Sequence, residues 1–415
     1  MIINRRQTLK AIAAGGLTVT ANALSAIRST LPLPVAAVVT TYYRNSHADV
    51  LCGKIMEGWR QDGGAGPNLK LAAIYTDQVH ARDLSRSLAE RHGVHIATTI
   101  DDALTLGTDQ LAVGGVLSIG EHGDYPSNAI GQVKYPRRRF FDQIADTMKR
   151  CGKVVPVFSD KHLSWSWKDA LNMYERARQQ KIPFMAGSSL PVTWRFPATE
   201  IPIGTEMEEV VTVGYGGIEA YGFHALEAMQ CIIERRRGGE SGVASVSAVP
   251  VEKIPEWLEK HPAKRNLMKR AIRAFNGNAE RLTDRLSKDS ALFCLKFRDG
   301  AEATIAMLNG ICDQFATAVR LRDQGRVVPI WHRLEYSHPY GHFEHLLRGI
   351  ESMFHSGEPA WPVERTLLTT GVLDRAMHCL NDEGTERHVE TPELAIRYQP
   401  SPWGYANRSG LPFPE

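Results

Sequence analysis

The chain has 415 residues, of which 43% are hydrophobic and 23% are charged, and its formal net charge is +3. This length is enough for two or three domains, and the composition is that of a globular protein. The basic residues lack the clustering with aromatic residues that marks a nucleic-acid surface, so we expect no nucleic-acid partner. We interpret the two arginine triplets, 137–139 and 235–237, as solvated helix faces, with an anion-binding patch as the alternative.

The six cysteines stand singly, at positions 52, 151, 231, 294, 312 and 379. No Cys-x-x-Cys pair occurs, which argues against a structural zinc site. We expect most of them to be buried thiols.

The first residues suggest export. A basic start with a twin arginine, Arg5-Arg6, precedes an apolar run rich in Ala and Gly over 11–26. This pattern resembles a Tat signal, which predicts a periplasmic or exported protein that crosses the membrane folded. The alternative is an amphipathic N-terminal helix. The run is too short to span a membrane stably, and no other segment approaches a span.

Residues 33–190 alternate between strand and helix patterns. We predict strands at 34–40, 69–75, 94–97, 111–119, 154–158 and 184–186, and helices at 48–59, 83–92, 100–106, 140–150 and 167–180. This alternation predicts an α/β domain with a doubly wound parallel sheet of the Rossmann type.

The rhythm changes after residue 208. We predict strands at 209–214, 242–251, 290–297, 301–308, 315–322 and 327–334, and helices at 221–237, 257–274, 343–355 and 362–379. The Asp299-Gly300 pair predicts a hairpin between two of these strands. The pattern indicates an α+β domain with a mostly antiparallel open sheet. We therefore divide the chain into a signal and linker (1–32), a Rossmann-like domain (33–190), a substrate and oligomerisation domain (191–399) and a C-terminal tail (400–415) that wraps the body.

Three stretches occur in an informative order. Asp160-Lys161-His162 follows a Gly-Lys and a strand, GGIEAYGFHALE covers 216–227, and the helix 343–353 is followed by Ser-Gly-Glu-Pro at 356–359. Together they resemble the Gfo/Idh/MocA family of sugar oxidoreductases, whose motifs are Glu-Lys-Pro and GG…D-x-G-x-H-x-x-D. The resemblance implies a Rossmann domain followed by an open-sheet domain, a nicotinamide cofactor (NAD or NADP), a small carbohydrate substrate and a homo-oligomer formed through the C-terminal sheet.

The resemblance also implies catalytic residues. Lys161 and His224 occupy the motif positions that hold and deprotonate a sugar hydroxyl, and both residue types suit proton transfer near neutral pH. The family's aspartate is replaced by Ala220, so we take the adjacent Glu219 as the third catalytic candidate. The alternative for His224 is a structural role, bonding a backbone carbonyl at the start of its helix.

Polar residues gather after the predicted strands, where ligands bind in doubly wound sheets. They are Glu121, His122, Asp124, Asp160, His162 and His47. Separately, we expect His342 to line the pocket. Our substrate-binding candidates are His122, Asp124, Tyr125, His162, Arg195 and Glu227. The loop Glu121-His122-Gly123-Asp124 has three interpretations: a metal site, an acid–base pair, or a loop held by its own hydrogen bonds.

The dinucleotide fingerprint is missing. The loop after the first strand, 40–47, contains no glycine and carries two tyrosines and an arginine where a pyrophosphate would lie. Its hydroxyl, guanidinium and amide groups could still bind an anion. The cofactor-binding candidates are Thr41, Tyr42, Arg44, Asn45, His47, Asp77 and Glu121. For Asp77 we favour an N-cap of the next helix over a ribose contact.

Two enzymatic functions follow. The first is a Gfo/Idh/MocA-like oxidoreductase that acts on a sugar or sugar derivative with NAD(P). The second keeps the fold without the usual nicotinamide site and is a carbohydrate hydrolase, lyase or isomerase, either cofactor-free or dependent on a divalent metal. A periplasmic sugar-binding protein is a third interpretation, which Lys161 and His224 argue against.

Overall fold

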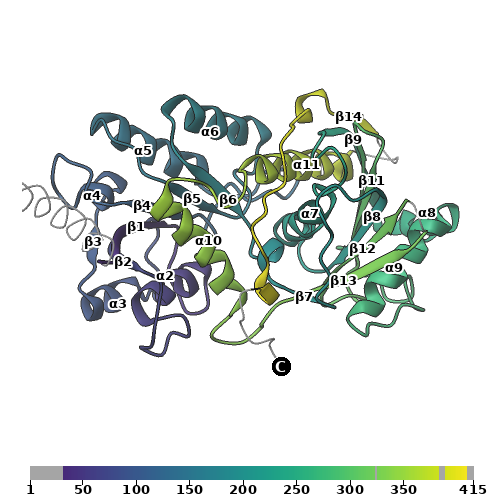
Figure 1. The fold of residues 1–415 in the computed structure, drawn as a ribbon, viewed down its shortest axis with the longest axis horizontal. Helices are drawn as coiled ribbons and strands as arrows, with labels where there is room; N and C mark the ends of the chain where they lie inside the picture. The colour runs from purple at the N-terminus through teal and green to yellow at the C-terminus, as the bar shows by residue number, and fades with distance from the viewer. Residues whose placement is uncertain (1–30, 323–324, 383–387, 409–415) are drawn as a thin grey trace, which may run out of the picture.

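The computed structural model describes residues 31–322, 325–382 and 388–408. The predicted signal segment over 1–30 lies outside the described residues. Two sheets stand side by side, the first built by the N-terminal part of the chain and the second by the later part (Figure 1).

The first sheet has six parallel strands in the order β3-β2-β1-β4-β5-β6, which is the predicted doubly wound arrangement. The strands are β1 (Leu33–Val39), β2 (Leu69–Thr76), β3 (His95–Ala97), β4 (Gly115–Ile119), β5 (Val157–Asp160) and β6 (Phe184–Gly187). The strand order reverses between β1 and β4. A crevice outside the carboxyl ends of these strands is therefore the expected place for a ligand.

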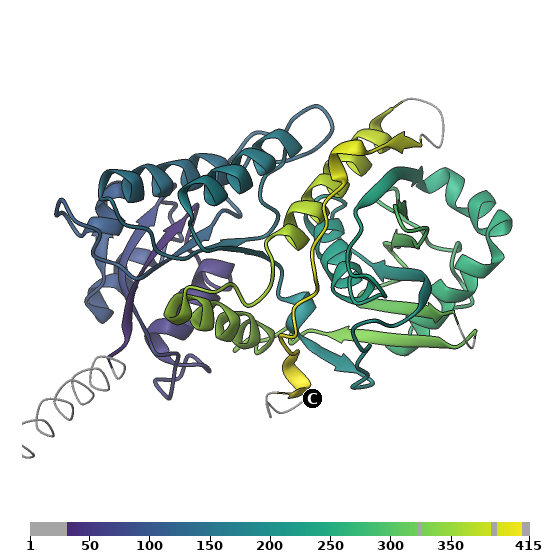
Figure 2. The same cartoon turned by 45° about the horizontal axis from the view of Figure 1, so that its top comes forward.

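Successive side chains of each strand point to opposite faces of the sheet and contribute to two apolar layers. In β1, Val35, Ala37 and Val39 face one layer, whereas Ala36 and Val38 face the other, so the strand is buried on both sides. The first layer is covered by α2 (His47–Glu57), α3 (Ser85–His92) and α10 (His342–Ser356), and the second by α4 (Ile100–Thr105), α5 (Arg137–Arg150) and α6 (Trp167–Gln180) (Figure 2).

Helix α10 comes late in the chain and packs back on the first sheet, where Phe354 lies directly against Gly115 of β4. A Cβ at position 115 would lie 2.6 Å from the Phe354 ring, so only glycine permits this approach. The predicted domain boundaries at residues 190 and 399 stay predictions. The contact between Phe354 and Gly115 joins residues from the two sides of the boundary at 190.

The second sheet has eight strands in the order β14-β9-β10-β11-β8-β12-β13-β7, and β8 and β11 form its parallel pair. The strands are β7 (Trp194–Phe196), β8 (Met207–Gly214), β9 (Val243–Pro250), β10 (Ala291–Phe297), β11 (Glu302–Met307), β12 (Phe315–Leu321), β13 (Val327–Arg333) and β14 (Val389–Glu390). The predicted mostly antiparallel sheet is confirmed. Short 3-10 turns lie at Leu190–Val192, Val251–Lys253, Pro392–Leu394 and Ala406–Arg408.

Helices cover both faces of this sheet. On one face lie α7 (Ala220–Ile233) and α11 (Glu364–Asn381). On the other, α9 (Pro262–Ala274) packs over β8, β12 and β13, and α8 (Ile254–Lys260) packs against β9 and α9. The single helix predicted over 257–274 is wrong. Pro262 has no N–H to donate to the preceding turn, so it ends one helix and opens the next at its first position.

A buried ion pair joins α7 to α11. The Arg365 guanidinium donates to both oxygens of Glu234, with Nε to Oε2 at 2.9 Å and Nη2 to Oε1 at 2.5 Å, and the Tyr398 hydroxyl donates to Oε2 at 2.8 Å. Arg365 is 5% exposed and Glu234 is 1% exposed. The pair is therefore shielded from water, and the attraction between the two charges offsets the cost of removing each from water.

We predict that Arg365→Gln lowers the free energy of unfolding by about 3–5 kcal/mol, because it leaves the buried Glu234 carboxylate without its partner. Urea unfolding followed by circular dichroism measures the change. Arg375→Gln is the matched control, since Arg375 bonds Glu393 at the surface and its loss should cost less than about 1 kcal/mol. Equal losses for the two variants would contradict the prediction.

Candidate functional site

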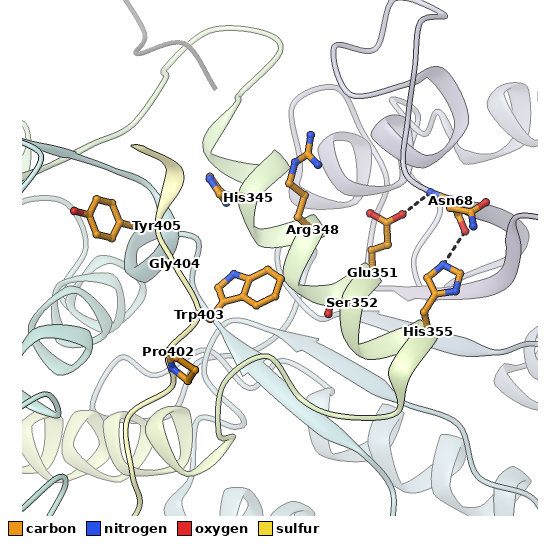
Figure 3. Close-up of a pocket in the computed structure, with 10 residues that line it drawn as sticks. All are labelled: Asn68, His345, Arg348, Glu351, Ser352, His355, Pro402, Trp403, Gly404 and Tyr405. Carbon is orange, nitrogen blue, oxygen red and sulfur yellow. Dashed lines mark hydrogen bonds between the residues drawn. The ribbon is translucent and has the colours of Figure 1, made fainter. Parts of the chain in front are cut away.

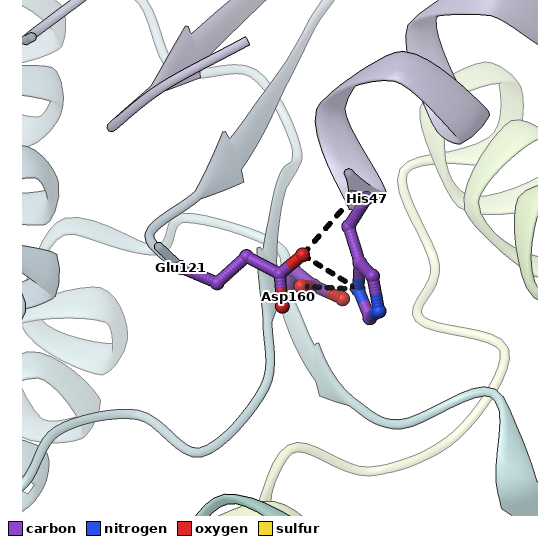
Figure 4. Close-up of side chains that lie close together, drawn as sticks. All are labelled: His47, Glu121 and Asp160. Carbon is purple, nitrogen blue, oxygen red and sulfur yellow. Dashed lines mark hydrogen bonds and ion pairs between the residues drawn. The ribbon is translucent and has the colours of Figure 1, made fainter. Parts of the chain in front are cut away.

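Titratable side chains converge at the carboxyl edge of the first sheet, next to the point where the strand order reverses. His47 is the first residue of α2, Glu121 follows β4, Asp160 ends β5, and Lys161 comes directly after it (Figure 4). We call His47, Glu121, Asp160 and Lys161 the edge cluster. Its members come from three separate segments, so only the folded sheet brings them together.

The Lys161 ammonium is the hub of the edge cluster. Its Nζ atom lies 2.5 Å from Glu121 Oε2 and 3.2 Å from Asp160 Oδ2, and 2.6 and 2.9 Å from the two ring nitrogens of His47. His47 Nδ1 lies 2.8 Å from Asp160 Oδ2. Lys161 and Asp160 are 6% and 1% exposed, so these are desolvated contacts.

The backbone after β5 explains how neighbouring residues reach one cluster. Side chains of successive strand residues point to opposite faces. Lys161 breaks that alternation because its φ is +75°, in the left-handed region that non-glycine residues rarely adopt. Its N–H donates to the carbonyl of Gly187, whose own φ is +129°. Such local strain is common at functional sites.

Charge compensation keeps the two carboxylates ionised. Burial alone would raise the pKa of the Glu121 carboxyl, but the charges of His47 and Lys161 hold that pKa well below its usual range. The pKa of Asp160 is lowered in the same way, with burial again opposed by His47 and Lys161. Both groups are therefore acceptors at neutral pH.

His224 faces the same space from the second domain. The turn before its helix depends on Gly216, whose φ is +87° and whose Cβ, if present, would lie 2.4 Å from the Tyr221 ring. His224 Nδ1 lies 2.6 Å from Ser188 Oγ, at the end of β6. Burial, followed by the charges of Lys161 and His47, lowers the pKa of His224 well below its usual value, so the ring is neutral. The Lys161 and His47 charges therefore act on the His224 ring, whereas the catalytic roles of Lys161 and His224 stay predictions.

Glu227 lies behind His224 and is fully buried. It accepts hydrogen bonds from Thr369 Oγ1 at 2.7 Å, from Thr366 Oγ1 at 3.3 Å and from the Ser188 N–H at 3.4 Å. Burial raises its pKa. The structure therefore places this substrate-binding candidate as a support for Ser188 and His224.

A second polar group lies beneath the edge cluster. Arg137 donates from Nε to the Gly120 carbonyl at 2.7 Å, and its Nη1 lies 2.8 Å from His162 Nε2. Glu219 accepts from the Val133 N–H at 2.9 Å and lies 3.7 Å from His162. Glu219 and His162 thus fasten the 120–136 segment to α7.

The prediction that both arginine triplets are solvated helix faces is wrong for one member of each. Arg137 is 2% exposed and Arg236 is 3% exposed. Arg236 is buried because it pairs with Glu240 and Asp299. Arg137 is the first residue of α5 and bonds Gly120 and His162, whereas α7 ends at Ile233, so the second triplet follows a helix and is not part of one.

Asp77 is not an N-cap, so that interpretation is wrong. Helix α3 begins at Ser85, and Leu84 occupies its N-cap position without a side-chain bond. The Asp77 carboxylate instead accepts from Arg139 Nη2 at 2.7 Å, from the Tyr125 hydroxyl at 2.7 Å and from the Tyr75 hydroxyl at 2.8 Å. The ribose-binding position is thus held by the chain's own side chains.

The loop after β1 does not offer the usual pyrophosphate cradle. Tyr42 is 1% exposed and packs in the core, and Thr41 is also buried. The first N–H of α2, on His47, donates to Glu121 Oε1 at 3.0 Å. A helix N-terminus attracts anions, and here that position holds a carboxylate of the protein. The described residues therefore do not fit a dinucleotide in its usual pose.

Of the remaining candidates, His122 lies beside the edge cluster, with Nε2 3.2 Å from Glu121 Oε1 and a side chain 46% exposed. The others lie apart from it. Asp124 points to solvent and bonds Gln78 through its backbone, and Arg44 and Asn45 are exposed. Arg195 is buried and stacks on Tyr405, 4.3 Å from the ring centroid.

Asp160 is one of the residues that the sequence places at the strand ends, and in the structure it belongs to the edge cluster. Two further residues that the site uses are not among those predicted. Ser188 contacts His224, and its place directly after a predicted strand of the parallel sheet was an available signal. Thr369 holds Glu227 from α11, and no local pattern points to it.

A separate hollow of about 800 Å³ lies between α10 and the C-terminal segment (Figure 3). Trp403 and Arg348 stand on its two sides, and Glu351 and His355 bond the backbone of Asn68 at 2.5 and 3.1 Å. The edge cluster, rather than this hollow, gathers the buried titratable groups that chemistry requires.

Several solved protein structures have a fold similar to that of this chain. GenD2 from gentamicin A biosynthesis, solved in complex with NAD, aligns with a TM-score of 0.56 at 15% identity over 87% of this chain and 96% of that one. A putative myo-inositol dehydrogenase from Sinorhizobium meliloti 1021 gives 0.54 at 14% identity, over 86% and 99%. The scyllo-inositol dehydrogenase of Lactobacillus casei gives 0.56 at 11% identity, over 87% and 98%.

These likenesses show that the chain has the two-domain fold of such dehydrogenases, as the resemblance to the Gfo/Idh/MocA family implies. No family model and no curated protein sequence matches the chain.

We predict that His162 makes stability fall in mild acid. Burial, with the nearby Arg137 charge, lowers the pKa of His162 from 6.5 to about 4. The unfolded chain therefore binds this proton first, and stability is lost as pH falls from about 6.5 towards 4, by up to about 3 kcal/mol. Urea unfolding across this range should show a shallower pH slope for His162→Gln. An unchanged slope would contradict the assignment.

Proposed function

We propose that the protein is an oxidoreductase of the Gfo/Idh/MocA type that acts on a sugar or polyol, with NAD or NADP as its redox partner. The observation that carries the proposal is that Lys161 and His224 both meet the end of β6 at the carboxyl edge of the first sheet, where the Lys161 N–H donates to Gly187 and the His224 ring bonds Ser188. Inositol and sugar dehydrogenases share the fold over nearly their full length, which supports the reaction class.

In this proposal the chain supplies binding and proton transfer. A substrate hydroxyl lies against Lys161 Nζ, and His224, kept neutral, orients it through its second ring nitrogen. The hydroxyl proton passes along the edge cluster towards the Asp160 carboxylate, whose Oδ2 lies 2.8 Å from His47 Nδ1 and 3.2 Å from Lys161 Nζ. Tyr221 and Phe315 form an aromatic wall beside His224, suited to a sugar face.

The nicotinamide would accept or supply the hydride. The assignment of this cofactor depends on the fold neighbours, because Glu121 fills the α2 N-terminus in the described structure. The same observation favours a second candidate, a metal-dependent or cofactor-free carbohydrate hydrolase, lyase or isomerase on the same fold.

We further propose export by a Tat-type signal, on the twin arginine of the sequence. In the described ranges no helix is both long and apolar enough to cross a bilayer. A homo-oligomer through the second sheet would have to use strands other than β8 and β12, since α9 covers those.

We predict that Lys161→Ala and His224→Ala each lower kcat by about 10²–10⁴-fold, the range of one acid–base group. Activity is followed as reduced-nicotinamide absorbance over a panel of inositols and hexoses. Arg375→Gln, a surface change remote from the edge cluster, is the control and should keep full activity. Wild-type rates in both site variants would refute the site.

The cofactor has its own test. The folded protein is denatured, and the released small molecules are identified by mass spectrometry, with thermal shifts recorded for added NAD(H) and NADP(H). Bound nucleotide or a nucleotide-dependent shift supports the oxidoreductase. The absence of both contradicts it and leaves the second candidate.

A further inference from the structure

We propose that His47, Glu121 and Asp160 form a binding site for one divalent transition-metal ion, Zn²⁺ or Mn²⁺, and that the Lys161 ammonium stands at the cation position when the metal is absent. This inference goes beyond the proposed oxidoreductase and does not depend on it. Four independent features of the edge cluster carry it.

The first feature is the donor geometry. One ligand atom from each of His47, Glu121 and Asp160 lies within 4.8 Å of the others (Figure 4). Metal–ligand bonds of about 2.1 Å place neighbouring ligands roughly 3–4 Å apart, so a small contraction closes the shell. The donors come from α2, the β4 loop and β5, and the sheet itself therefore sets their positions.

The second feature is an unsatisfied buried oxygen. Asp160 is 1% exposed, and its Oδ1 has no hydrogen-bond partner among the described residues. A buried acceptor in this state costs about 1–3 kcal/mol. Native proteins rarely leave one, and a bound ion or water is the usual explanation. Asp160 therefore brings to the donor set an acceptor atom that no described residue uses.

The third feature is a mismatch between Lys161 and His47. An ammonium has only donors, and an imidazole carries an N–H on at least one ring nitrogen in either protonation state. Nζ nevertheless lies 2.6 and 2.9 Å from the two ring nitrogens, so one contact sets a donor against a donor. A metal ion carries no hydrogens and would bind the acceptor nitrogen without this conflict.

The fourth feature is the support behind the ligands. The His47 N–H and the Thr40 hydroxyl hold Glu121 through its Oε1 and its carbonyl, and the Phe343 ring meets the His47 ring at 4.5 Å. Metal ligands are commonly fixed in this way by surrounding contacts. His122, whose Nε2 lies 3.2 Å from Glu121 Oε1, is the nearest further donor.

The donor set selects the metal. One imidazole favours Zn²⁺ and similar ions, and two carboxylates favour harder ions such as Mn²⁺. The two carboxylates outweigh the one Lys161 charge, so a dication restores neutrality once the ammonium leaves. In that position the ion would bind adjacent oxygen atoms of a diol or hydroxy-ketone. It would also stand in front of α2, where a pyrophosphate would otherwise bind.

The test uses the full chain, purified without chelators, and elemental analysis by mass spectrometry. We expect about one Zn²⁺ or Mn²⁺ per chain, or saturable binding of added ZnCl₂ or MnCl₂ by the chelator-treated protein in calorimetry. Asp160→Asn should weaken binding at least about tenfold, within the range seen for altered metal shells. Asp124→Asn, on the loop that carries Glu121 but with an exposed side chain, is the matched control and should bind as the wild type does.

Lys161→Met separates a metal site from a plain ion-pair network and remains informative if Asp160→Asn fails to fold. A metal site predicts that this variant binds Zn²⁺ or Mn²⁺ about tenfold more tightly, because its competing cation is gone, and that the metal raises its Tm. No saturable binding of Mn²⁺ or Zn²⁺ by either the wild type or Lys161→Met overturns the proposal. Released nucleotide in that case would leave the oxidoreductase standing, whereas metal without nucleotide would overturn the oxidoreductase and sustain this inference.

Discussion

One buried cation holds the site together. The Lys161 ammonium lies within about hydrogen-bond distance of Glu121, Asp160 and His47, and it links the ends of β4 and β5 to the start of α2. Two carboxylates this close and this buried would repel one another and pay heavily for lost hydration without a positive partner. A cation between Glu121 and Asp160 is therefore required to keep the two buried carboxylates ionised and close together, whatever reaction the protein catalyses.

The second domain contributes to the same site through buried contacts. Helix α7 carries His224 to the end of β6, where the ring bonds Ser188. Thr369 of α11 donates to Glu227 of α7, and Glu227 in turn accepts from the Ser188 N–H. A second link runs from Arg137 through His162 to Glu219, under the 120–136 segment. These contacts make the site a property of both domains, and they explain why polar groups remain in an otherwise apolar interior.

The sequence predicts the fold well where a local period decides it. The β1 strand and its neighbours show as apolar runs, and Lys161 and His224 lie in motifs with glycines or a strand beside them. Prediction from the sequence fails where the role of a residue depends on a contact with a residue far away in the chain. Asp77 resembles an N-cap but bonds Arg139 from another helix, and Arg137 sits in a basic triplet yet is buried against His162. Ser188 joins the site only once parallel strands align their ends, and Pro262 divides a helix whose apolar period runs through it.

Crystallography with anomalous scattering tests the central claim, that the edge of the first sheet is a cation-binding reaction centre, most directly. Crystals would be grown with Zn²⁺, and data collected on both sides of the zinc absorption edge. The account predicts one strong anomalous peak bounded by His47, Glu121 and Asp160, with the Lys161 side chain turned away from its present position. An anomalous map without a peak there, with Lys161 Nζ still between the two carboxylates, would contradict it.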